Sequence, residues 1–324
     1  TAGTASAMEE FIVNDTTTAA IYGGVYFAAF NQEQDNGTTV STVSDVVDNG
    51  TTLGFQFESV LPNNMTAYGR LEEDGFDMVD GGDQAQFTDE AYVGIEGSFG
   101  KVQFGRNDSI YDDMIRDNFD YQEYLTPTGY GPTRERALQF YSSNVGGFSV
   151  ALEAGINGDL DETISGSDAD GNTGDSVSFA GAASYTFDAV TVTGAIDQRG
   201  NDTDGFSGDP SRYVDNPIYG LVGSVDLNPL VVSVGYQKAE EATAAGTADT
   251  DIFSADAQYA YTNGSVYGTY QAVDTDNDPD GERDEVVLGA TYVVGQIYGF
   301  VEYAAYEKNQ DEDDAVAVGG GYNF

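Results

Sequence analysis

The sequence predicts an all-β protein: a sixteen-stranded antiparallel transmembrane β-barrel whose third long loop folds into the lumen. Three observations predict this fold class. Apolar and polar residues alternate along most of the 324-residue chain, short turns alternate with long acidic loops, and residues 107–136 form an insert between two strands. A period of two gives each strand one apolar and one polar face. The insert exceeds the ~2–5 residues of a hairpin loop, so we expect it to fold inward.

The strands are predicted from this alternation, taken in order along the chain. Leu53, Phe55 and Phe57, for example, alternate with Gly54 and Gln56. Strands of ~9–11 residues cross a bilayer when tilted, whereas strands of soluble sheets average ~5–6 residues. An even count lets the barrel close, and closure satisfies every backbone N–H and C=O in lipid. The predicted strands span residues 20–30, 51–60, 66–72, 88–98, 101–106, 137–144, 148–155, 176–187, 190–199, 217–227, 230–238, 252–262, 265–273, 285–293, 296–307 and 315–324.

The connections between the strands fall into two classes. Short turns such as Phe99-Gly100 and Asn263-Gly264 alternate with long, acidic, glycine-rich loops. Short turns on one rim and long loops on the other are typical of a meandering transmembrane barrel. A soluble β-sandwich or propeller is the alternative fold, and long loops on a single rim disfavour it. The long loops are predicted at residues 74–86, 159–175, 201–216, 242–251 and 274–284.

Composition excludes several function classes. The 56 acidic residues against 11 basic residues give a formal charge of −45, which argues against a nucleic-acid partner. The chain has no Cys and no His, so disulfides, thiolate chemistry, the usual general base and the commonest metal ligand are all missing. No motif for a nucleophile or a base stands out, so we do not expect an enzyme. No apolar run reaches the ~18–20 residues of a transmembrane helix.

Residues 1–7 are small and uncharged, and Ala5-Ser6-Ala7 has the A-x-A form of a signal-peptidase site. Two alternatives are open for this segment: a remnant of an export signal, or a flexible N-terminus. In either case we exclude it from the fold. Residues 8–324 are predicted to form a single barrel domain, with residues 107–136 as a constriction loop.

The insert is predicted to contain a short helix within residues 110–122. Asp113, Asp117 and Asp120 stand at positions i, i+4 and i+7, which places them on one face. We expect this face to present carboxylates to the lumen. Asp112 and Arg116 form an i,i+4 pair that would support the helix. The residues expected to pack the opposite face on the barrel wall are Tyr111, Ile115 and Phe119.

Basic residues concentrate around the same insert. Four of the eleven in the chain lie within residues 106–136. Arg70 shares a strand face with Tyr68 and Glu72, which we take as the luminal face. Strict alternation instead puts Arg106, Arg134 and Arg136 on the same face as apolar residues. We therefore expect bulges or strand ends to turn these three arginines inward.

Four stretches carry a resemblance to a known family. Residues 91–107 read A-Y-V-G-I-E-G-S-F-G-K-V-Q-F-G-R-N, and residues 134–150 read R-E-R-A-L-Q-F-Y-S-S-N-V-G-G-F-S-V. Residues 8–26 read M-E-E-F-I-V-N-D-T-T-T-A-A-I-Y-G-G-V-Y, and the chain ends G-Y-N-F. The first two stretches resemble the strand 4–5 and strand 6–7 hairpins of the Gram-negative general porins. The last two are similar to the N-terminal segment and the final strand of that family.

The resemblance implies a homotrimer of sixteen-stranded barrels in the outer membrane of a Gram-negative bacterium, in contact with lipid and lipopolysaccharide. Each barrel would be a passive, water-filled diffusion channel for ions and small hydrophilic solutes. Arg134 and Arg106 match two arginines of the family that face loop carboxylates. The family's P-E-F-G-G turn is absent, and residues 125–131 stand in its place. The residues predicted to form the pore constriction are Asp112, Asp113, Asp117, Asp120, Glu123, Arg70, Arg106, Arg116, Arg134 and Arg136.

Opposed acidic and basic rows create a transverse field, and rings of charge set ion selectivity. Because acids are in excess, we expect a cation-selective channel; the alternative is that these charges only hold the loop in place. A sugar-specific channel is a second hypothesis, and an acidic surface or binding protein without a channel is a third. The aromatic track that a sugar channel needs, or else a set of loop anchors, is Tyr111, Phe119, Tyr121, Tyr124 and Tyr130.

No cofactor is predicted, although the acidic loops could hold Ca²⁺ or Mg²⁺ loosely. One loop imitates the start of an EF-hand, but Val287 takes the place of the bidentate glutamate, and a second loop lacks the glycine. The charge of −45 also makes the protomer repel itself. High salt screens such repulsion within ~3–8 Å, so we expect a marine or halophilic source. The candidate calcium residues are Asp276, Asp278, Asp280, Asp168 and Asp170.

Overall fold

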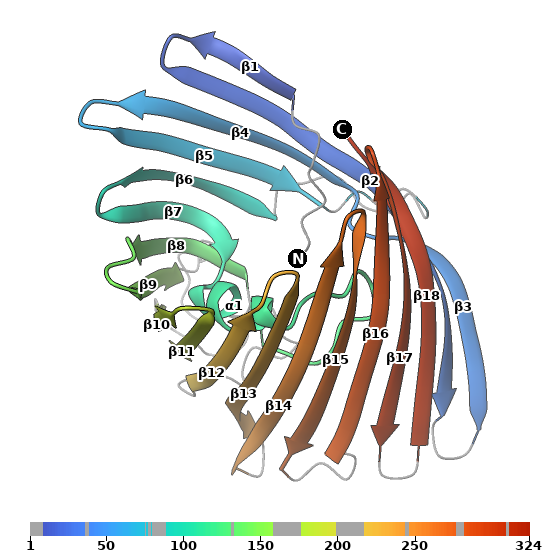
Figure 1. Cartoon of the computed structure of the whole chain (residues 1–324). Helices are drawn as coiled ribbons and strands as arrows, with labels where there is room; N and C mark the ends of the chain where they lie inside the picture. The colour runs from blue at the N-terminus through green and yellow to red at the C-terminus, as the bar shows by residue number, and fades with distance from the viewer. Residues whose placement is uncertain are drawn as a thin grey trace, which may run out of the picture.

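The computed structural model describes residues 9–35, 39–74, 76, 79, 89–130, 133–157, 176–198, 217–243, 246–276, 282–308 and 311–324. The predicted N-terminal segment 1–7 and the predicted loops at 159–175 and 201–216 lie outside these residues. Within them, eighteen strands form one antiparallel sheet (Figure 1). The strands are β1 (Glu9–Asn14), β2 (Thr17–Asp35), β3 (Val40–Asp48), β4 (Thr52–Leu61), β5 (Met65–Glu73), β6 (Glu90–Gly97), β7 (Gly100–Asp108), β8 (Thr133–Ser142), β9 (Phe148–Asn157), β10 (Ser176–Phe187), β11 (Val190–Gln198), β12 (Pro217–Asp226), β13 (Leu230–Thr243), β14 (Gly246–Tyr261), β15 (Gly264–Thr275), β16 (Glu282–Val294), β17 (Ile297–Lys308) and β18 (Asp311–Asn323).

The sheet closes on itself at β2. One edge of β2 pairs with β1 and then with β18, and the opposite edge pairs with β4 and then with β3. Strands β1 and β18 therefore share one position around the barrel, and β3 and β4 share another. The eighteen strands thus fill the sixteen positions of a closed barrel. The predicted fold class and strand count are confirmed. A soluble sandwich or propeller, the alternative fold, is wrong because neither closes one sheet into a single ring.

Two strands, β1 and β3, were not among the predicted sixteen. In β3 the spacing of Val40, Val43 and Val46 has no period of two, so alternation gives no strand signal. The strand forms because β2 continues past the predicted end at residue 30 and offers it an edge to pair with. The loop predicted at residues 242–251 is also wrong, since β13 and β14 continue to pair through most of it.

Successive residues of the strands separate into an apolar outer face and a polar inner face. Leu138 is 48% exposed whereas Gln139 is 1% exposed, and Val301 is 52% exposed whereas Glu302 is 1% exposed. This arrangement is the reverse of a water-soluble barrel. Transfer of the outer face from water to lipid is favourable by ~25 cal/mol per Å² of apolar area. Further residues of the outer face are Leu71, Val93, Phe104, Leu152, Phe179, Leu221, Phe253, Leu288 and Val316.

Polar side chains of the inner face bond to one another. Gln103 Nε2 donates to Gln139 Oε1 at 2.8 Å, and Asn107 Nδ2 donates to the same oxygen at 3.2 Å. Further along the barrel, Gln271 Nε2 donates to Ser254 Oγ at 2.9 Å. These side chains are buried and satisfy one another, and a polar inner face is typical of a transmembrane barrel. In the part of the chain that the structure describes, no helix has the length and apolar character needed to cross a membrane.

Candidate functional site: a loop on the inner face of the barrel

The segment between β7 and β8, residues 109–132, is named here the inner loop and is described through residue 130. It begins with α1 (Ile110–Met114), continues with the 3₁₀ turn η1 (Arg116–Asn118) and is irregular from there. Ser109 caps α1, because its Oγ accepts a hydrogen bond from the N–H of Asp112 at 3.1 Å. Figure 1 shows α1 on the concave side of the sheet, where it contacts β9, β10 and β11. The loop is shorter than the predicted 107–136 because both strands extend into that range.

One side of the inner loop packs on the barrel wall. Tyr111, Ile115 and Phe119 are buried, which confirms the packing predicted for them. Two wall glycines make room for these side chains. A Cβ on Gly220 would lie 2.7 Å from the Tyr111 hydroxyl, and one on Gly235 would lie 2.5 Å from the Phe119 ring. The wall residues in this cluster are Ile218, Val222, Ala239, Ile252 and Val273.

A wall carboxylate, Glu302 on β17, holds the middle of the inner loop. Its two oxygens accept hydrogen bonds from the successive backbone N–H groups of Glu123, Tyr124 and Leu125 at 2.6, 3.0 and 2.8 Å. The Tyr267 hydroxyl donates to the same carboxylate at 2.6 Å. With four donors, this buried charge is fully solvated by the protein, which is the condition for burying it without a large penalty.

Glu285 on β16 holds the inner loop at a second point. Its carboxylate accepts hydrogen bonds from the N–H of Thr128 at 2.8 Å and from the hydroxyl of the same residue at 2.7 Å. Arg283 Nε lies 2.7 Å from the carboxylate, and Arg283 Nη2 donates to the Thr128 hydroxyl at 2.7 Å. The loop is therefore attached to neighbouring strands at residues 123–125 and at residue 128.

The acidic residues of the helical part have different surroundings. Asp117 is exposed, whereas Asp112 is buried beside Arg116. The guanidinium of Arg116 lies 3.6 Å from a carboxylate oxygen of Asp112 and 3.9 Å from one of Asp120, so the predicted Asp112–Arg116 pair has a second acidic partner. Burial raises the pKa of Asp112 to about 8, although Arg116 opposes the shift. Asp113 accepts a hydrogen bond from the hydroxyl of Tyr141 on β8.

Arg70 projects from β5 on the inner face of the barrel wall. Its Nε lies 2.6 Å from a carboxylate oxygen of Glu90, and its Nη2 contacts Glu72. The guanidinium also lies 5.1 Å from the centre of the Tyr22 ring. Arg70 is therefore fixed by two carboxylates and an aromatic ring, and its side chain retains 32% exposure.

The expected irregularity is present in β8, whereas Arg106 of β7 keeps regular register opposite Ala91, in the alternation of Phe104. The pairing of β7 with β8 shifts register between Gly105 and Asn107, and Arg136 has a positive φ of 52°. Because β8 contains one extra residue, Arg134 stands opposite Asn107 in the register. Its position therefore no longer belongs to the apolar face that includes Leu138. The side chain of Arg134 lies outside the described part of the chain. Arg106 Nε donates to the carbonyl oxygen of Asp89 at 3.2 Å.

Comparisons with known proteins identify the family. The family model described as Gram-negative porin matches residues 1–314. The chain belongs to the Gram-negative porins. A monosaccharide porin of Halomonas sp and a major outer membrane protein of Halomonas elongata are each 30% identical to it over 349 aligned positions, which cover 96% of this chain and 93% of the relative. The porin is therefore an outer-membrane channel protein of a Gram-negative bacterium.

Solved structures share the fold of this porin. The anion-selective porin from Comamonas acidovorans superposes with a TM-score of 0.73 at 15% sequence identity. The superposition covers 95% of this chain and 100% of the Comamonas chain. The trimer form of OmpT from Vibrio cholerae superposes with a TM-score of 0.70 at 17% identity, covering 96% and 100%. At these identities the likeness shows the barrel architecture alone.

The predicted calcium residues of the porin lie almost entirely outside the described residues. Asp276 is described, and its N–H donates to the carbonyl oxygen of Asp249 at 2.9 Å. Across the described ranges, no group of three or more acidic residues is arranged to hold a metal ion. The sites at Asp168, Asp170, Asp278 and Asp280 stay predictions.

Sequence reasoning missed the wall residues that hold the inner loop of the porin. Glu302 and Glu285 are not among the predicted site residues. The available signal was their position: Glu302 stands between Val301 and Tyr303 in the middle of a twelve-residue strand, where its parity places it on the inner face. A carboxylate there needs partners from inside the barrel. Lys101 of β7 is also absent from the predicted set.

Proposed function

We propose that this porin is a general diffusion channel for ions and small hydrophilic solutes that favours cations, with the inner loop as its constriction. The proposal is supported by the way its arginines are paired. Arg70 contacts two carboxylates of the wall, and Arg116 contacts two carboxylates of the inner loop. Each of these arginines is outnumbered by carboxylates, so both groups retain negative charge when ionised.

Further loop acids add to this charge. Asp113 and Asp117 have no direct contact with a cation among the described residues. The single observation that carries the proposal is this excess of carboxylate over guanidinium on the loop and the wall beside it. Charges that line a narrow pore attract counter-ions and set its selectivity. The proposed constriction keeps the full predicted set: Asp112, Asp113, Asp117, Asp120, Glu123, Arg70, Arg106, Arg116, Arg134 and Arg136.

We further propose a homotrimer whose apolar outer faces contact lipid, lipopolysaccharide and neighbouring protomers. Support comes from the outer faces themselves and from the related OmpT, which has a trimer form. Divalent cations would bridge acidic loops and anionic lipid headgroups without a dedicated site. Cross-linking of the detergent-purified protein tests the trimer, and a band that stays at the mass of the protomer would contradict it.

The test of selectivity is the zero-current potential of the purified porin in a planar bilayer between unequal KCl solutions. We expect the sign of this potential to show that K⁺ is more permeant than Cl⁻. The double substitution Asp113→Asn with Asp117→Asn should lower the ratio of K⁺ to Cl⁻ permeability by at least about twofold, because it removes two lumenal charges. Asp314→Asn is the matched control, since this exposed residue of β18 shares its parity with outward-facing Val316. A zero-current potential of the anionic sign would refute the proposal.

A channel specific for small sugars is the second candidate, favoured by the Halomonas relative named monosaccharide porin. Three members of the aromatic track, Tyr111, Phe119 and Tyr130, are buried and act as anchors of the loop. Tyr124 is partly exposed and stacks on Phe30 with ring centroids 5.5 Å apart. Glucose added to the bilayer discriminates the two functions. A sugar channel shows saturable block of the current, whereas a general channel shows only the effect of viscosity.

A further inference from the structure

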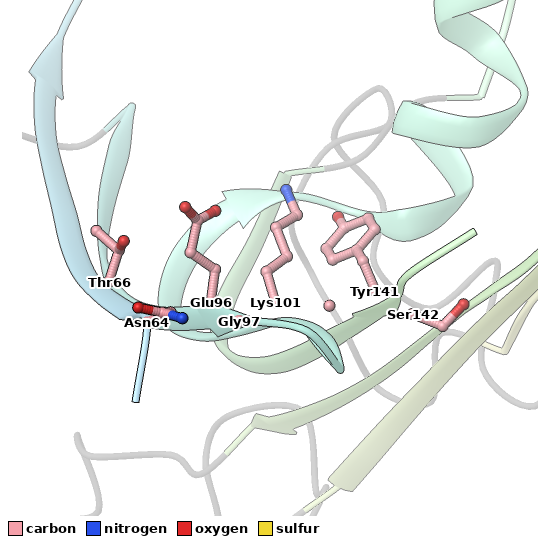
Figure 2. Close-up of a pocket in the computed structure, with 8 residues that line it drawn as sticks. Asn64, Thr66, Glu96, Gly97, Lys101, Tyr141 and Ser142 are labelled. Atoms are coloured by element: carbon pink, nitrogen blue, oxygen red, sulfur yellow. The ribbon is translucent and has the colours of Figure 1, made fainter. Parts of the chain in front are cut away.

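A cavity of about 540 Å³ lies at the turn-side end of β5–β8, at the rim where short turns join the strands. One row of paired residues defines its chemistry. Glu96 of β6 stands opposite Lys101 of β7, and Lys101 stands opposite Tyr141 of β8. Directly paired residues of antiparallel strands share a face. Figure 2 shows the three side chains standing side by side on the same side of the strands.

The row belongs to the inner face, because the Tyr141 hydroxyl donates to Asp113 of the inner loop. Lys101 has no carboxylate in direct contact among the described residues, in contrast to Arg70 and Arg116. Its ammonium lies 4.0 Å from the centre of the Tyr141 ring. A cation–π contact of this kind fixes the position of the ammonium without using its three N–H donors as an ion pair would.

Glu96 supplies the opposite charge beside Lys101. Its side chain is exposed, and it makes no ion pair with a described residue. Oppositely charged residues at directly paired positions are close enough to attract each other. Glu96 and Lys101 nevertheless stay more than an ion-pair distance apart, and both border the cavity. The cavity is therefore bordered by one positive and one negative charge that do not form an ion pair with each other.

We propose that this cavity binds a small zwitterionic solute, with its carboxylate on Lys101 and its ammonium on Glu96. The inference rests on the proposed channel function, since the solute reaches the cavity through the lumen. Carboxylates of the loop would repel an anionic solute, and Lys101 offers such a group a local partner. Hydroxyl and amide groups of Asn64, Thr66 and Ser142 line the remaining surface. The volume falls in the ~300–1,000 Å³ range of small-molecule sites.

The test uses three probes with the same three-carbon skeleton in the bilayer assay: β-alanine, propionate and propylammonium. We expect β-alanine to reduce or flicker the single-channel current at lower concentration than either singly charged probe. Lys101→Gln should raise the half-blocking concentration of β-alanine at least tenfold, which corresponds to a loss of about 1.4 kcal/mol in binding free energy. Glu96→Gln should bring β-alanine to the level of propionate. Lys238→Gln is the control of equal charge, because Lys238 Nζ lies 2.5 Å from Asp249 on β14 and outside the cavity.

The outcomes separate this inference from the function it rests on. A protein that opens no channel contradicts the proposed function. A cation-selective channel whose current β-alanine does not affect overturns the zwitterion site alone. Equal effects of Lys101→Gln and Lys238→Gln would show that only net charge matters, and propylammonium as effective as β-alanine would show that Lys101 takes no part. Each of these last two results also overturns the inference.

Discussion

Replacing Glu302 with glutamine keeps the size of the side chain but removes the charge that holds the middle of the inner loop. The carboxylate accepts four hydrogen bonds, three from the backbone N–H groups of residues 123–125 and one from Tyr267. A glutamine has a single acceptor oxygen, and its NH₂ group can only donate. The NH₂ group would therefore face N–H or O–H donors, and about half of the hydrogen bonds would be lost.

The magnitude follows from the kind of hydrogen bond. Bonds to a charged acceptor contribute ~1.5–3 kcal/mol each, so losing two weakens the attachment of the loop by about 3–6 kcal/mol. The barrel itself is closed by backbone pairing, in which the Glu302 side chain has no part. We therefore expect Glu302→Gln to assemble normally but to let residues 123–125 leave the wall. The loop would then sample several positions in the lumen.

The assay is single-channel recording, together with the exclusion limit measured by liposome swelling with sugars of increasing size. Glu302→Gln should show an altered mean conductance, excess open-channel noise and a shifted exclusion limit. Glu307→Gln is the matched control, because Glu307 lies on the same strand with an exposed side chain. Heat-modifiable mobility on gels checks that both variants form barrels.

The reasoning would be refuted by a Glu302→Gln channel that assembles and matches the native conductance, noise and exclusion limit. Such a result would mean that the three N–H groups find water or other acceptors at no net cost, and that the apolar anchors Tyr111, Ile115 and Phe119 suffice to hold the loop. A variant that fails to assemble would also contradict the reasoning, because it would tie Glu302 to barrel closure.

Four more predictions concern the loop and the net charge. Burial raises the pKa of Asp112 to about 8 and that of Glu123 to about 7, so both carboxyls gain protons as the pH falls through these values, and cation selectivity measured by zero-current potential should fall with them. The protonated Asp112 is favoured by the fold, so its contribution to stability is complete below its ordinary pKa of about 4 and is lost as the pH rises through 8. Asp112→Asn should remove this part of the pH dependence and leave the part that comes from Glu123. Gly220→Val should displace α1 and alter the conductance, because its Cβ meets Tyr111 at 2.7 Å, whereas Gly223→Val, with open space at its Cβ, should not. The thermal midpoint should rise with KCl as the charge of −45 is screened, and a midpoint independent of salt would contradict the halophilic prediction.

The barrel could be predicted from the sequence because a period of two reports directly which residues face outward. Leu138 and Gln139, or Val301 and Glu302, alternate in the sequence as they do in exposure. β3 was missed because its pairing depends on an extension of β2, a tertiary fact with no local pattern. The irregularity near Arg136 was predictable, since arginine on a lipid face is too costly to leave without a change of register.

The inner loop was predictable on one side only. The spacing of Tyr111, Ile115 and Phe119 defines an apolar stripe, and the wall meets that stripe as expected. The acidic side did not act as the uniform row that helical spacing predicts. Asp112 and Asp120 flank Arg116, Asp113 contacts Tyr141, and Asp117 is exposed. Those partners come from side-chain reach and from a neighbouring strand, which spacing along the loop does not contain.

Two groups of carboxylates in the barrel interior have different roles. Glu153, Glu285 and Glu302 lie on the wall, and each accepts a backbone N–H of the inner loop, at residue 110, at residue 128 and at residues 123–125. Because their charge is directed at these donors, replacing them should change the position of the loop and with it the size limit of the channel. Asp113 and Asp117 are not committed in this way, so replacing them should change which ions pass while the size limit stays. An excess of acid in the composition is therefore a poor guide to selectivity, which depends on the acids that the loop leaves free.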